Sequence, residues 1–254
     1  MHVAITGASK GIGLEVANKL KSQGYTLTAF DIIEPKFEVD KFIKLDFSDP
    51  KAIQNTLFSI NDKYDALINN AGIPPKEGQE EKILMVNFIG LKLFYEGMLK
   101  NLKKDASIVN TSSRAGSMWN ENLDQIRRLI NLKAKDLKQF INDQNINPVR
   151  AYNLSKEALI VLTISQTKEL LSKNLRMNSV CPAAVSTDIH QDFMNAFGNK
   201  VAKNIAKVGR PASPKEIADL IIYLISPQSF WIKGQNITID GGLSSIIMSE
   251  TLSI

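Results

Sequence analysis

Short apolar runs alternate along the chain with longer segments in which apolar residues recur every three or four positions. The first pattern is typical of buried β-strands and the second of amphipathic helices. The predicted strands cover residues 2–5, 26–30, 42–46, 65–69 and 106–111, and a last strand lies within 234–242. The predicted helices cover residues 14–20, 50–60, 79–103, a segment that starts at Asn147-Pro148, and a segment that starts within 209–216 and ends near 225. Strands that alternate with helices in this way favour a parallel sheet with helices on both faces.

The composition fits one large α/β domain that spans residues 1–254. Hydrophobic residues make up 44% of the chain, which is enough for a sizeable core. The sequence contains no internal repeat, no low-complexity tract and no linker rich in proline, glycine or serine. One domain is therefore a better interpretation than two.

Charge and cysteine content exclude several classes of protein. The net charge is +5, but the lysine and arginine residues are scattered, which argues against a dedicated nucleic-acid surface. Cys181 is the only cysteine, and His2 and His190 have no zinc-site spacing, so we expect neither an intrachain disulfide nor a metal. Residues 2–5 already form a predicted strand, and no apolar run approaches the ~18 residues of a membrane span. We expect a cytoplasmic protein that does not enter membranes.

The first candidate site is the segment Thr6-Gly-Ala-Ser-Lys-Gly-Ile-Gly13, between the first predicted strand and helix. In that context Gly7 permits a tight turn, Gly11 lets the backbone approach a pyrophosphate, and Gly13 lets the helix pack closely on the strand. The spacing is Gly-x3-Gly-x-Gly rather than Gly-x-Gly-x-x-Gly, and an ordinary glycine-rich turn is the alternative. The candidate cofactor-binding residues are Gly7, Ser9, Lys10, Gly11, Ile12 and Gly13.

Asp31 ends the second predicted strand, 18 residues after Gly13. An acidic residue at about this offset binds the ribose hydroxyls of a dinucleotide and would repel a 2′-phosphate. Asp31 therefore favours NAD(H), whereas Lys10 could reach a phosphate and keeps NADP(H) open. The alternative for Asp31 is a turn residue that only ends a strand.

Two further strand ends offer candidate cofactor contacts. Asp46 and Phe47 follow the third strand, where Asp46 either meets an adenine edge or caps the next helix. The fourth strand leads into Asn69-Asn-Ala-Gly72, whose small residues let a second loop cross close to a dinucleotide. We include Asn70, Ala71 and Gly72 in the candidate site.

Tyr152 and Lys156 stand four residues apart in the segment Arg150-Ala-Tyr-Asn-Leu-Ser-Lys156. On a helix these two side chains share one face. Asn147 as N-cap and Pro148 in the first turn predict the helix start, so Tyr152 lies near the positive end of the helix dipole. The ammonium and the dipole both favour phenolate, which predicts a lowered pKa for Tyr152.

Polar residues in apolar surroundings complete the candidate chemistry. Asn87 lies within the apolar helix 79–103, where a buried amide either back-bonds and kinks the helix or belongs to a polar site. Ser112 and Ser113 follow the fifth strand, at the edge where open α/β sheets bind ligands.

Together these segments resemble the classical short-chain dehydrogenase/reductase family. The matching segments are Thr6-Gly-x3-Gly-x-Gly13, Asn69-Asn-Ala-Gly72, Asn87, Val109-Asn-Thr-Ser-Ser113, Tyr152-x3-Lys156 and Asp240-Gly-Gly242. They occur in the family's order and cover nearly the whole chain. The resemblance implies a single Rossmann-type, doubly wound α/β domain with about seven parallel strands.

The resemblance also implies roles for four catalytic residues. Ser113, the second serine of its motif, would orient and polarise a substrate carbonyl, and Tyr152 would exchange a proton with the substrate oxygen. Lys156 would hold the nicotinamide ribose and lower the pKa of Tyr152. Asn87 would anchor a water molecule through which the proton reaches solvent.

Residues 119–147 depart from the usual pattern of the family, which places its serine and tyrosine closer together. The apolar residues of this insertion predict one or two amphipathic helices. A similar insertion occurs in the branch that includes bacterial 3α-hydroxysteroid dehydrogenase/carbonyl reductase, which this chain resembles most. There it blocks the usual helix-pairing surface, so we expect a homodimer, with a tetramer as the alternative.

The segment Asn178 to Thr187 is the second departure, because Ala183 replaces the usual glycine after Pro182. That replacement restricts the backbone beside the expected nicotinamide. Pro182, Val185 and Thr187 still match the family segment that holds the carboxamide and the diphosphate. Cys181 is better interpreted as a small buried residue than as a nucleophile.

Residues 188–208 would form a substrate lid in this family, with a plain surface helix as the alternative. Their apolar residues are Ile189, Phe193, Met194, Phe197 and Val201. Such a lid suggests an apolar substrate, steroid-like or aromatic. The tail, residues 243–254, is moderately apolar and is expected to contact a partner subunit.

The predicted function is NAD(H)-dependent interconversion of a secondary alcohol and a ketone. One alternative is an NADPH-dependent ketoreductase, for example one that acts on 3-oxoacyl thioesters. Another is a dinucleotide-binding sensor without catalysis. An intact set of Ser113, Tyr152 and Lys156 argues against the sensor.

Overall fold

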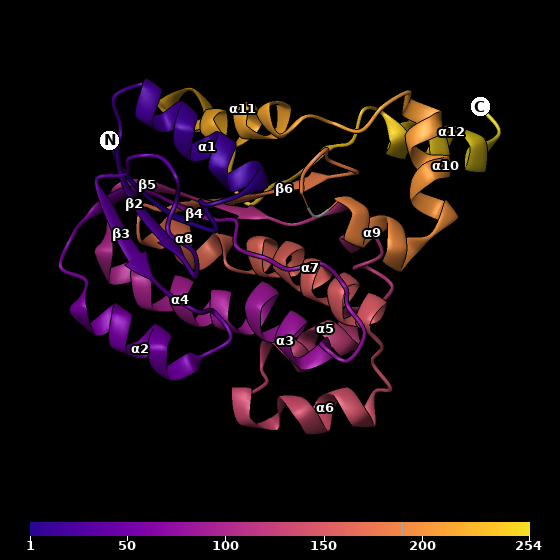
Figure 1. Cartoon of the computed structure of the whole chain (residues 1–254), viewed down its shortest axis with the longest axis horizontal. Helices are drawn as coiled ribbons and strands as arrows, with labels where there is room; N and C mark the ends of the chain where they lie inside the picture. The colour runs from indigo at the N-terminus through magenta and orange to yellow at the C-terminus, as the bar shows by residue number, and fades with distance from the viewer. Residues whose placement is uncertain (189) are drawn as a thin grey trace.

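The computed structural model describes residues 1–188 and 190–254, and these form one parallel sheet between two layers of helices (Figure 1). The strand order is β3-β2-β1-β4-β5-β6-β7. The strands are β1 His2–Thr6, β2 Thr26–Asp31, β3 Lys41–Lys44, β4 Tyr64–Asn69, β5 Leu102–Thr111, β6 Arg176–Pro182 and β7 Asn236–Ile239. The order reverses between β1 and β4, which opens a crevice at the carboxyl ends of the strands. The predicted fold class is confirmed.

The central strands are apolar on both sides because helices cover both faces of the sheet. On one face lie α1 (Gly11–Ser22) and α11 (Pro214–Ile225). On the other lie α2 (Pro50–Ser59), α4 (Gly90–Met98) and α7 (Pro148–Ser165). The remaining short elements are α8 Thr167–Ser172, the 3₁₀ turns η3 Arg114–Gly116 and η5 Pro227–Ser229, and the helices described below.

The predicted helix over 79–103 is a stack of four pieces. It consists of α3 (Glu80–Leu84), a π-helical turn η1 (Met85–Ile89), α4 and a 3₁₀ turn η2 (Leu99–Asn101). It ends before residue 103 because Leu102 already pairs with Tyr64 in the sheet. Asn87 lies in the π-helical turn. Such turns are frequently found at functional sites.

The insertion forms the predicted amphipathic helices, α5 (Leu123–Ile130) and α6 (Leu137–Asp143), joined by the 3₁₀ turn η4 (Ala134–Asp136). Their apolar faces are buried through Ile126, Leu129, Leu137 and Phe140. Helix α5 packs on α7, and α6 packs on α3 at the outer edge of the molecule (Figure 1). The homodimer expected from this insertion stays a prediction.

A buried ion pair within α7, between Arg150 and Glu157, is hydrogen bonded to the insertion. The Arg150 guanidinium donates two hydrogen bonds to the Glu157 carboxylate, at 2.9 and 2.7 Å, and a third to Gln125 Oε1 on α5 at 2.8 Å. Asn122, before α5, donates to Glu157 Oε1 at 3.1 Å. The Glu157 side chain is only 1% exposed, so these donors take the place of the water that would otherwise solvate its carboxylate.

The predicted lid forms two helices, α9 (His190–Phe197) and α10 (Asn199–Val208), linked at Gly198. They lie with the C-terminal helix α12 (Leu243–Leu252) at one end of the molecule (Figure 1). Ile189, one of the lid's predicted apolar residues, lies outside the described residues. Lys207 of α10 pairs with Glu250 of α12.

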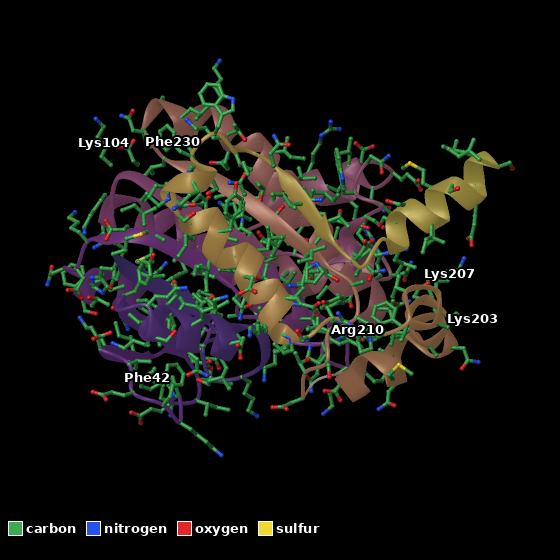
Figure 2. The ribbon with its side chains drawn as sticks, turned by 90° about the horizontal axis from the view of Figure 1, so that it is seen from above. Phe42, Lys104, Lys203, Lys207, Arg210 and Phe230 are labelled. Carbon is green, nitrogen blue, oxygen red and sulfur yellow. The ribbon has the colours of Figure 1, made fainter. Side chains whose placement is uncertain are left out.

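The basic side chains are spread over the surface, as the sequence predicted. Lys203, Lys207 and Arg210 lie around α10, whereas Lys104 lies at the far end of the molecule (Figure 2). Over residues 1–188 and 190–254, no helix has both the length and the apolar character needed to cross a bilayer. The same residues contain no cluster of histidine, cysteine or carboxylate side chains suited to a metal.

Replacing Arg150 with methionine should destabilise the fold, because it leaves the buried Glu157 carboxylate without its cation. We expect a loss of about 3 kcal/mol in the free energy of unfolding, the low end for a broken buried pair, since Arg150 is 24% exposed. Urea denaturation measures this loss. Arg127→Met removes an exposed arginine of α5 and should change stability by no more than about 0.5 kcal/mol. Equal losses of stability in the two variants would contradict the stabilising role of the buried Arg150–Glu157 pair.

Candidate active site

The carboxyl ends of the strands border a cavity of about 970 Å³. Sites for small molecules and cofactors measure on the order of 300–1,000 Å³, so this cavity has room for a large ligand. Of the predicted site residues, all line it except Gly13 and Asn87. The tertiary structure thus collects segments that are far apart in the sequence at one crevice.

The glycine turn is tightly packed beneath the cavity. Gly7 has φ +70°, and a Cβ there would come within 2.8 Å of the Ala71 backbone. A Cβ on Gly13 would lie 1.9 Å from the Gly7 carbonyl oxygen, which explains why Gly13 supports the turn without lining the cavity. Helix α1 begins at Gly11, and its N-cap residue Lys10 makes no side-chain cap. The first N–H groups of α1 thus remain available to an anion, so the turn fits a pyrophosphate.

A second loop is fastened to this turn. The Thr6 hydroxyl oxygen accepts hydrogen bonds from the backbone N–H groups of Asn70 and Ala71, each at 3.0 Å. The Asn70 side chain donates to the Gly7 carbonyl at 3.0 Å. Ala71 and Gly72 are therefore held at the cavity wall, where they were predicted.

Asp31 sits at the cavity rim with its carboxylate oriented by the backbone. Its Oδ2 accepts from Ser9 N at 3.0 Å and its Oδ1 from Ile33 N at 3.3 Å. The bond to Ile33 is that of a turn residue, and the bond to Ser9 fixes the carboxylate beside the glycine turn. The geometry therefore fits both interpretations of Asp31, as a ribose-binding residue and as a turn residue that ends a strand.

Asp46 and Phe47 also line the cavity, but Asp46 is not a helix cap. Its carboxylate accepts from the N–H and the hydroxyl of Ser48. The cap of α2 is Asp49, which accepts from Lys51 N and Ala52 N. Since β3 ends at Lys44, Asp46 lies in the loop beyond the strand.

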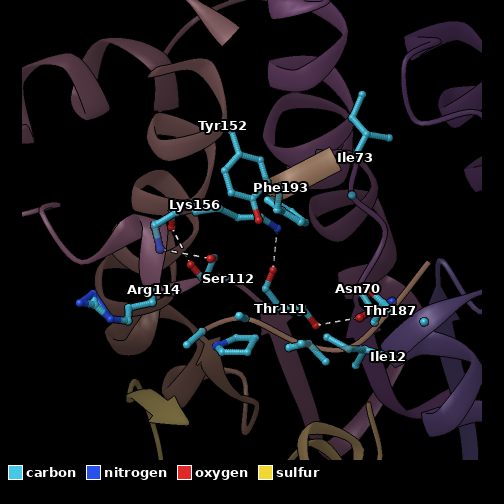
Figure 3. A pocket seen from close by; sticks show the side chains of 18 of the residues that line it. Ile12, Asn70, Ile73, Thr111, Ser112, Arg114, Tyr152, Lys156, Thr187 and Phe193 are labelled. Carbon is cyan, nitrogen blue, oxygen red and sulfur yellow. Dashed lines mark hydrogen bonds between the residues drawn. The ribbon is translucent and has the colours of Figure 1, made fainter. Parts of the chain in front are cut away.

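Ser113, Tyr152 and Lys156 all line the cavity. Figure 3 shows Tyr152 and Lys156 close to Ser112, the residue before Ser113. Helix α7 starts as predicted, with the Asn147 side chain accepting from Arg150 N at 2.8 Å. Lys156 Nζ donates to the Thr111 carbonyl at 3.0 Å and lies 5.7 Å from the centre of the Tyr152 ring.

The two adjacent serines have different environments. The Ser112 hydroxyl is buried and donates to the Lys156 carbonyl at 2.8 Å. Ser113 Oγ accepts from Ala115 N at 3.1 Å and is hydrogen bonded to Tyr152. Ser113 is thus the serine whose hydroxyl faces the tyrosine, in line with the choice made from the sequence.

The predicted lowering of the pKa of Tyr152 is wrong for the chain itself. Burial raises the pKa of Tyr152, and the hydrogen bond with Ser113 offsets only part of that effect. Burial also lowers the pKa of Lys156, from 10.5 to about 8. Desolvation outweighs the helix dipole here because both side chains are almost fully enclosed.

Asn87 is fully buried behind the cavity wall. Its amide accepts from Ile73 N at 2.8 Å and donates to Ile73 O at 3.0 Å, so it holds the loop after β4. A Cβ on Gly72 would touch both Asn87 Oδ1 and Lys156 Nζ, at 3.4 and 3.5 Å. Asn87 therefore lies both in an irregular helical turn and next to the polar site; its link to water stays a prediction.

The segment after β6 borders the cavity through Pro182, Val185 and Thr187. Ala183 does not have a positive φ, so the missing glycine causes no backbone strain. Val185 pairs with Ala212 in a parallel bridge. Cys181 is buried as expected; burial raises the pKa of its thiol, which donates to Asn236 Oδ1 at 2.8 Å.

Two lid aromatics cover the tyrosine. The Phe193 ring meets the Tyr152 ring edge to face at 5.2 Å, and Phe197 lies 6.3 Å from it. Arg114 also lines the cavity, and the sequence analysis did not select it. The available signal was its position directly after Ser113.

Comparisons with known proteins agree with this geometry. A family model described as short chain dehydrogenase matches residues 1–124, and one described as Enoyl-(Acyl carrier protein) reductase matches residues 130–244. Coniferyl-alcohol dehydrogenase of Pseudomonas sp. (strain HR199 / DSM 7063) is 34% identical over 246 residues, which cover 96% of each chain. The 3-alpha-hydroxysteroid dehydrogenase/carbonyl reductase of Comamonas testosteroni is 25% identical and covers 96% of this chain and 97% of its own.

Among solved structures, the 3-alpha-hydroxysteroid dehydrogenase from Pseudomonas sp. B-0831, complexed with NADH, has a TM-score of 0.85 and 24% identity. The match covers 98% of this chain and 99% of that one. It shows a shared fold.

The lowered pKa of Lys156 predicts a pH dependence of stability. Between about pH 8 and pH 10.5 the unfolded chain binds a proton that the folded chain has released. The cost of burying the ammonium is therefore fully present below pH 8 and falls as the pH rises. Between pH 7.5 and 9.5, wild type should gain about 2 kcal/mol in the free energy of unfolding relative to Lys156→Met. Urea unfolding measures both proteins, and parallel pH profiles would contradict the buried ammonium.

Proposed function

The chain belongs to the short-chain dehydrogenase/reductase family of oxidoreductases, and from that premise we propose that it interconverts a secondary alcohol and a ketone with NAD(H). The observation that carries this proposal is the convergence of Ser113, Tyr152 and Lys156 at the cavity that the glycine turn borders. A sensor without catalysis would have no need of this arrangement.

The residues at the cavity fit a dinucleotide. The glycine turn and Thr187 would hold the diphosphate, with Asp31 at the adenosine ribose and Asp46 and Phe47 near the adenine. Asn70, Ala71 and Gly72 would border it, and Pro182 and Val185 would contact the nicotinamide. The bound nicotinamide supplies or accepts the hydride.

The protein's own residues manage the proton. The Ser113 hydroxyl would hydrogen bond to the carbonyl oxygen and hold it beside the Tyr152 hydroxyl. The raised pKa of Tyr152 keeps the phenol protonated, which is the form that donates a proton to that oxygen. Lys156, fixed by the Thr111 carbonyl, would hold the nicotinamide ribose, and Asn87 would anchor the water that carries the proton onward.

The substrate is an apolar molecule, steroid-like or aromatic. Support comes from the lid side chains Phe193, Phe197 and Val201, which line the cavity, and from the two named relatives, which act on an aromatic alcohol and on steroids by their names. The lid would close over the substrate and exclude water. We also propose a cytoplasmic homodimer, as expected from the insertion of residues 119–147.

An NADPH-dependent ketoreductase that acts on 3-oxoacyl thioesters is the second candidate. Lys10 lines the cavity beside the glycine turn and could pair with a 2′-phosphate. A relative named 3-oxoacyl-[acyl-carrier-protein] reductase, from Vibrio harveyi, is 27% identical over 261 residues and also supports this candidate. Asp31 weighs against it because two carboxylate–backbone hydrogen bonds hold a negative charge at that position.

Loss of reduced-cofactor absorbance tests the proposal, with ketosteroids, aromatic ketones, quinones and an oxoacyl thioester as substrates. Tyr152→Phe should lower turnover by about 10³-fold, because it removes the proton donor, and should leave NADH binding intact. Fluorescence titration measures that binding. Retained turnover in the variant would refute the role of Tyr152, and NADH binding without turnover of any carbonyl would favour the sensor.

Removing the charge of Asp31 should shift the choice of cofactor. Asp31→Asn keeps an oxygen acceptor but ends the repulsion of a 2′-phosphate, so the ratio of kcat/KM for NADH to that for NADPH should fall about tenfold. Steady-state kinetics with both cofactors measure the ratio. Glu34→Gln, at an exposed position in the loop that follows β2 and Asp31, should leave the ratio unchanged. A wild type that prefers NADPH would overturn the assignment.

A further inference from the structure

Arg114 follows Ser113 directly and is the first residue of the 3₁₀ turn η3. Its side chain is 20% exposed and lines the same cavity as Tyr152. Figure 3 shows its guanidinium on the opposite side of Ser112 from Ile12 and Asn70. Arg114 is therefore placed at the end of the cavity away from the glycine turn, next to the residues that would hold the carbonyl.

The guanidinium of Arg114 has unused donors. Its one polar contact among the described residues is to Asp240, with 3.8 Å between Nε and Oδ2, which is too long for a hydrogen bond. The Nε atom is buried and has no hydrogen-bond partner. A guanidinium carries five N–H donors, and leaving such a group buried and unpaired costs stability.

Asp240 orients Arg114 without satisfying it. Its carboxylate is 6% exposed and accepts from Gly242 N at 3.0 Å and from Ser244 N at 2.8 Å. These bonds fix Asp240 at the turn after β7. The carboxylate therefore lies beside the guanidinium without accepting a hydrogen bond from it, and the donors of Arg114 remain free for another acceptor.

Other arginines of this chain show what a satisfied guanidinium looks like. Arg210, which also lines the cavity, donates to both oxygens of Glu216 at 2.9 and 2.7 Å. Arg150 donates to both oxygens of Glu157 and to Gln125. Arg114 differs from both, since the nearest carboxylate, that of Asp240, lies 3.8 Å from its Nε and accepts no hydrogen bond from it.

We propose that Arg114 determines substrate specificity by binding a carboxylate group that the substrate carries some distance from its carbonyl carbon. This inference rests on the proposed function and narrows its substrate class to apolar keto acids or hydroxy acids. A carboxylate matches the fork of a guanidinium with two parallel hydrogen bonds. A phosphate monoester fits less well, because Asp240 repels its two negative charges more strongly than the single charge of a carboxylate.

The position of Arg114 separates this role from cofactor binding. The diphosphate and the adenosine ribose belong to the glycine turn and Asp31, at the other end of the cavity. An effect of Arg114 should therefore depend on the substrate and be the same with NADH and NADPH.

Two aromatic ketones of nearly equal shape test the proposal: 4-acetylbenzoate and its methyl ester, which differ by one negative charge. For wild type we expect kcat/KM to be at least tenfold higher for the acid than for the ester. In Arg114→Met this ratio should fall at least tenfold, and Arg114→Lys should restore part of it. 4-Acetylphenyl phosphate, a dianion, should be a poorer substrate than the acid.

Arg127→Met provides the matched control, since it removes an exposed arginine far from the cavity lining. It should leave the ratio between acid and ester unchanged. An acid-to-ester ratio near one in wild type, or an equal ratio in wild type and Arg114→Met, would overturn the proposal.

A binding measurement keeps this test independent of turnover. Calorimetric titration of 4-acetylbenzoate into the protein saturated with NAD⁺ should give a Kd at least tenfold higher for Arg114→Met than for wild type. Binding that depends on Arg114 without turnover of any ketone would refute the proposed function and leave the role of Arg114 intact. Turnover of acid and ester with equal efficiency would refute the role of Arg114 and leave the proposed function intact.

Discussion

The buried ammonium of Lys156 is the constraint around which the candidate active site is assembled. The ammonium donates to the Thr111 carbonyl at the end of β5. The backbone carbonyl of Lys156 in turn accepts from the Ser112 hydroxyl. Gly116 packs so closely that a Cβ there would lie 2.8 Å from the Lys156 carbonyl carbon. A charge can be enclosed in this way only where its partners are fixed, so β5, η3 and α7 must meet in one arrangement.

Two faces of helix α7 make different contacts. One face presents Tyr152 and Lys156 to the cavity, and the other carries Glu157 to its partners Arg150, Gln125 and Asn122. Because Glu157 follows Lys156 directly, the hydrogen bond from Asn122 ties the insertion to α7 next to a residue of the candidate site. The insertion is thus part of the support of the site and more than an addition at its periphery.

The cavity has charged side chains at both of its ends. Asp31 stands at the rim beside the glycine turn, and Arg114 lies beyond Ser113 at the other end, with the aromatic lid between polar groups. In the roles proposed above, Asp31 would select the cofactor and Arg114 the substrate, so the two selections would rest on different residues.

The sequence alone determined the features that depend on neighbours along the chain. Alternating apolar patterns identified the strands and helices, Asn147-Pro148 located the start of α7, and the glycine spacing located the turn that packs beneath the cavity. Tyr152 and Lys156 were paired because helix geometry brings residues four apart together. Strand β6 was not recognised as a separate strand, since polar residues such as Asn178 and Ser179 interrupt its apolar pattern and bond to partners near β7.

Only the tertiary structure decided what depends on partners distant in the sequence. It placed Asn87 against Ile73, moved the cap of α2 to Asp49, and laid Phe193 over Tyr152. It also reversed the expected pKa shift of Tyr152, because the extent of burial is a property of the packed molecule and no local spacing reveals it. The unsatisfied donors of Arg114 follow from the same reason: Asp240 is far from Arg114 in the sequence, and only the fold brings the two side chains to a separation of 3.8 Å.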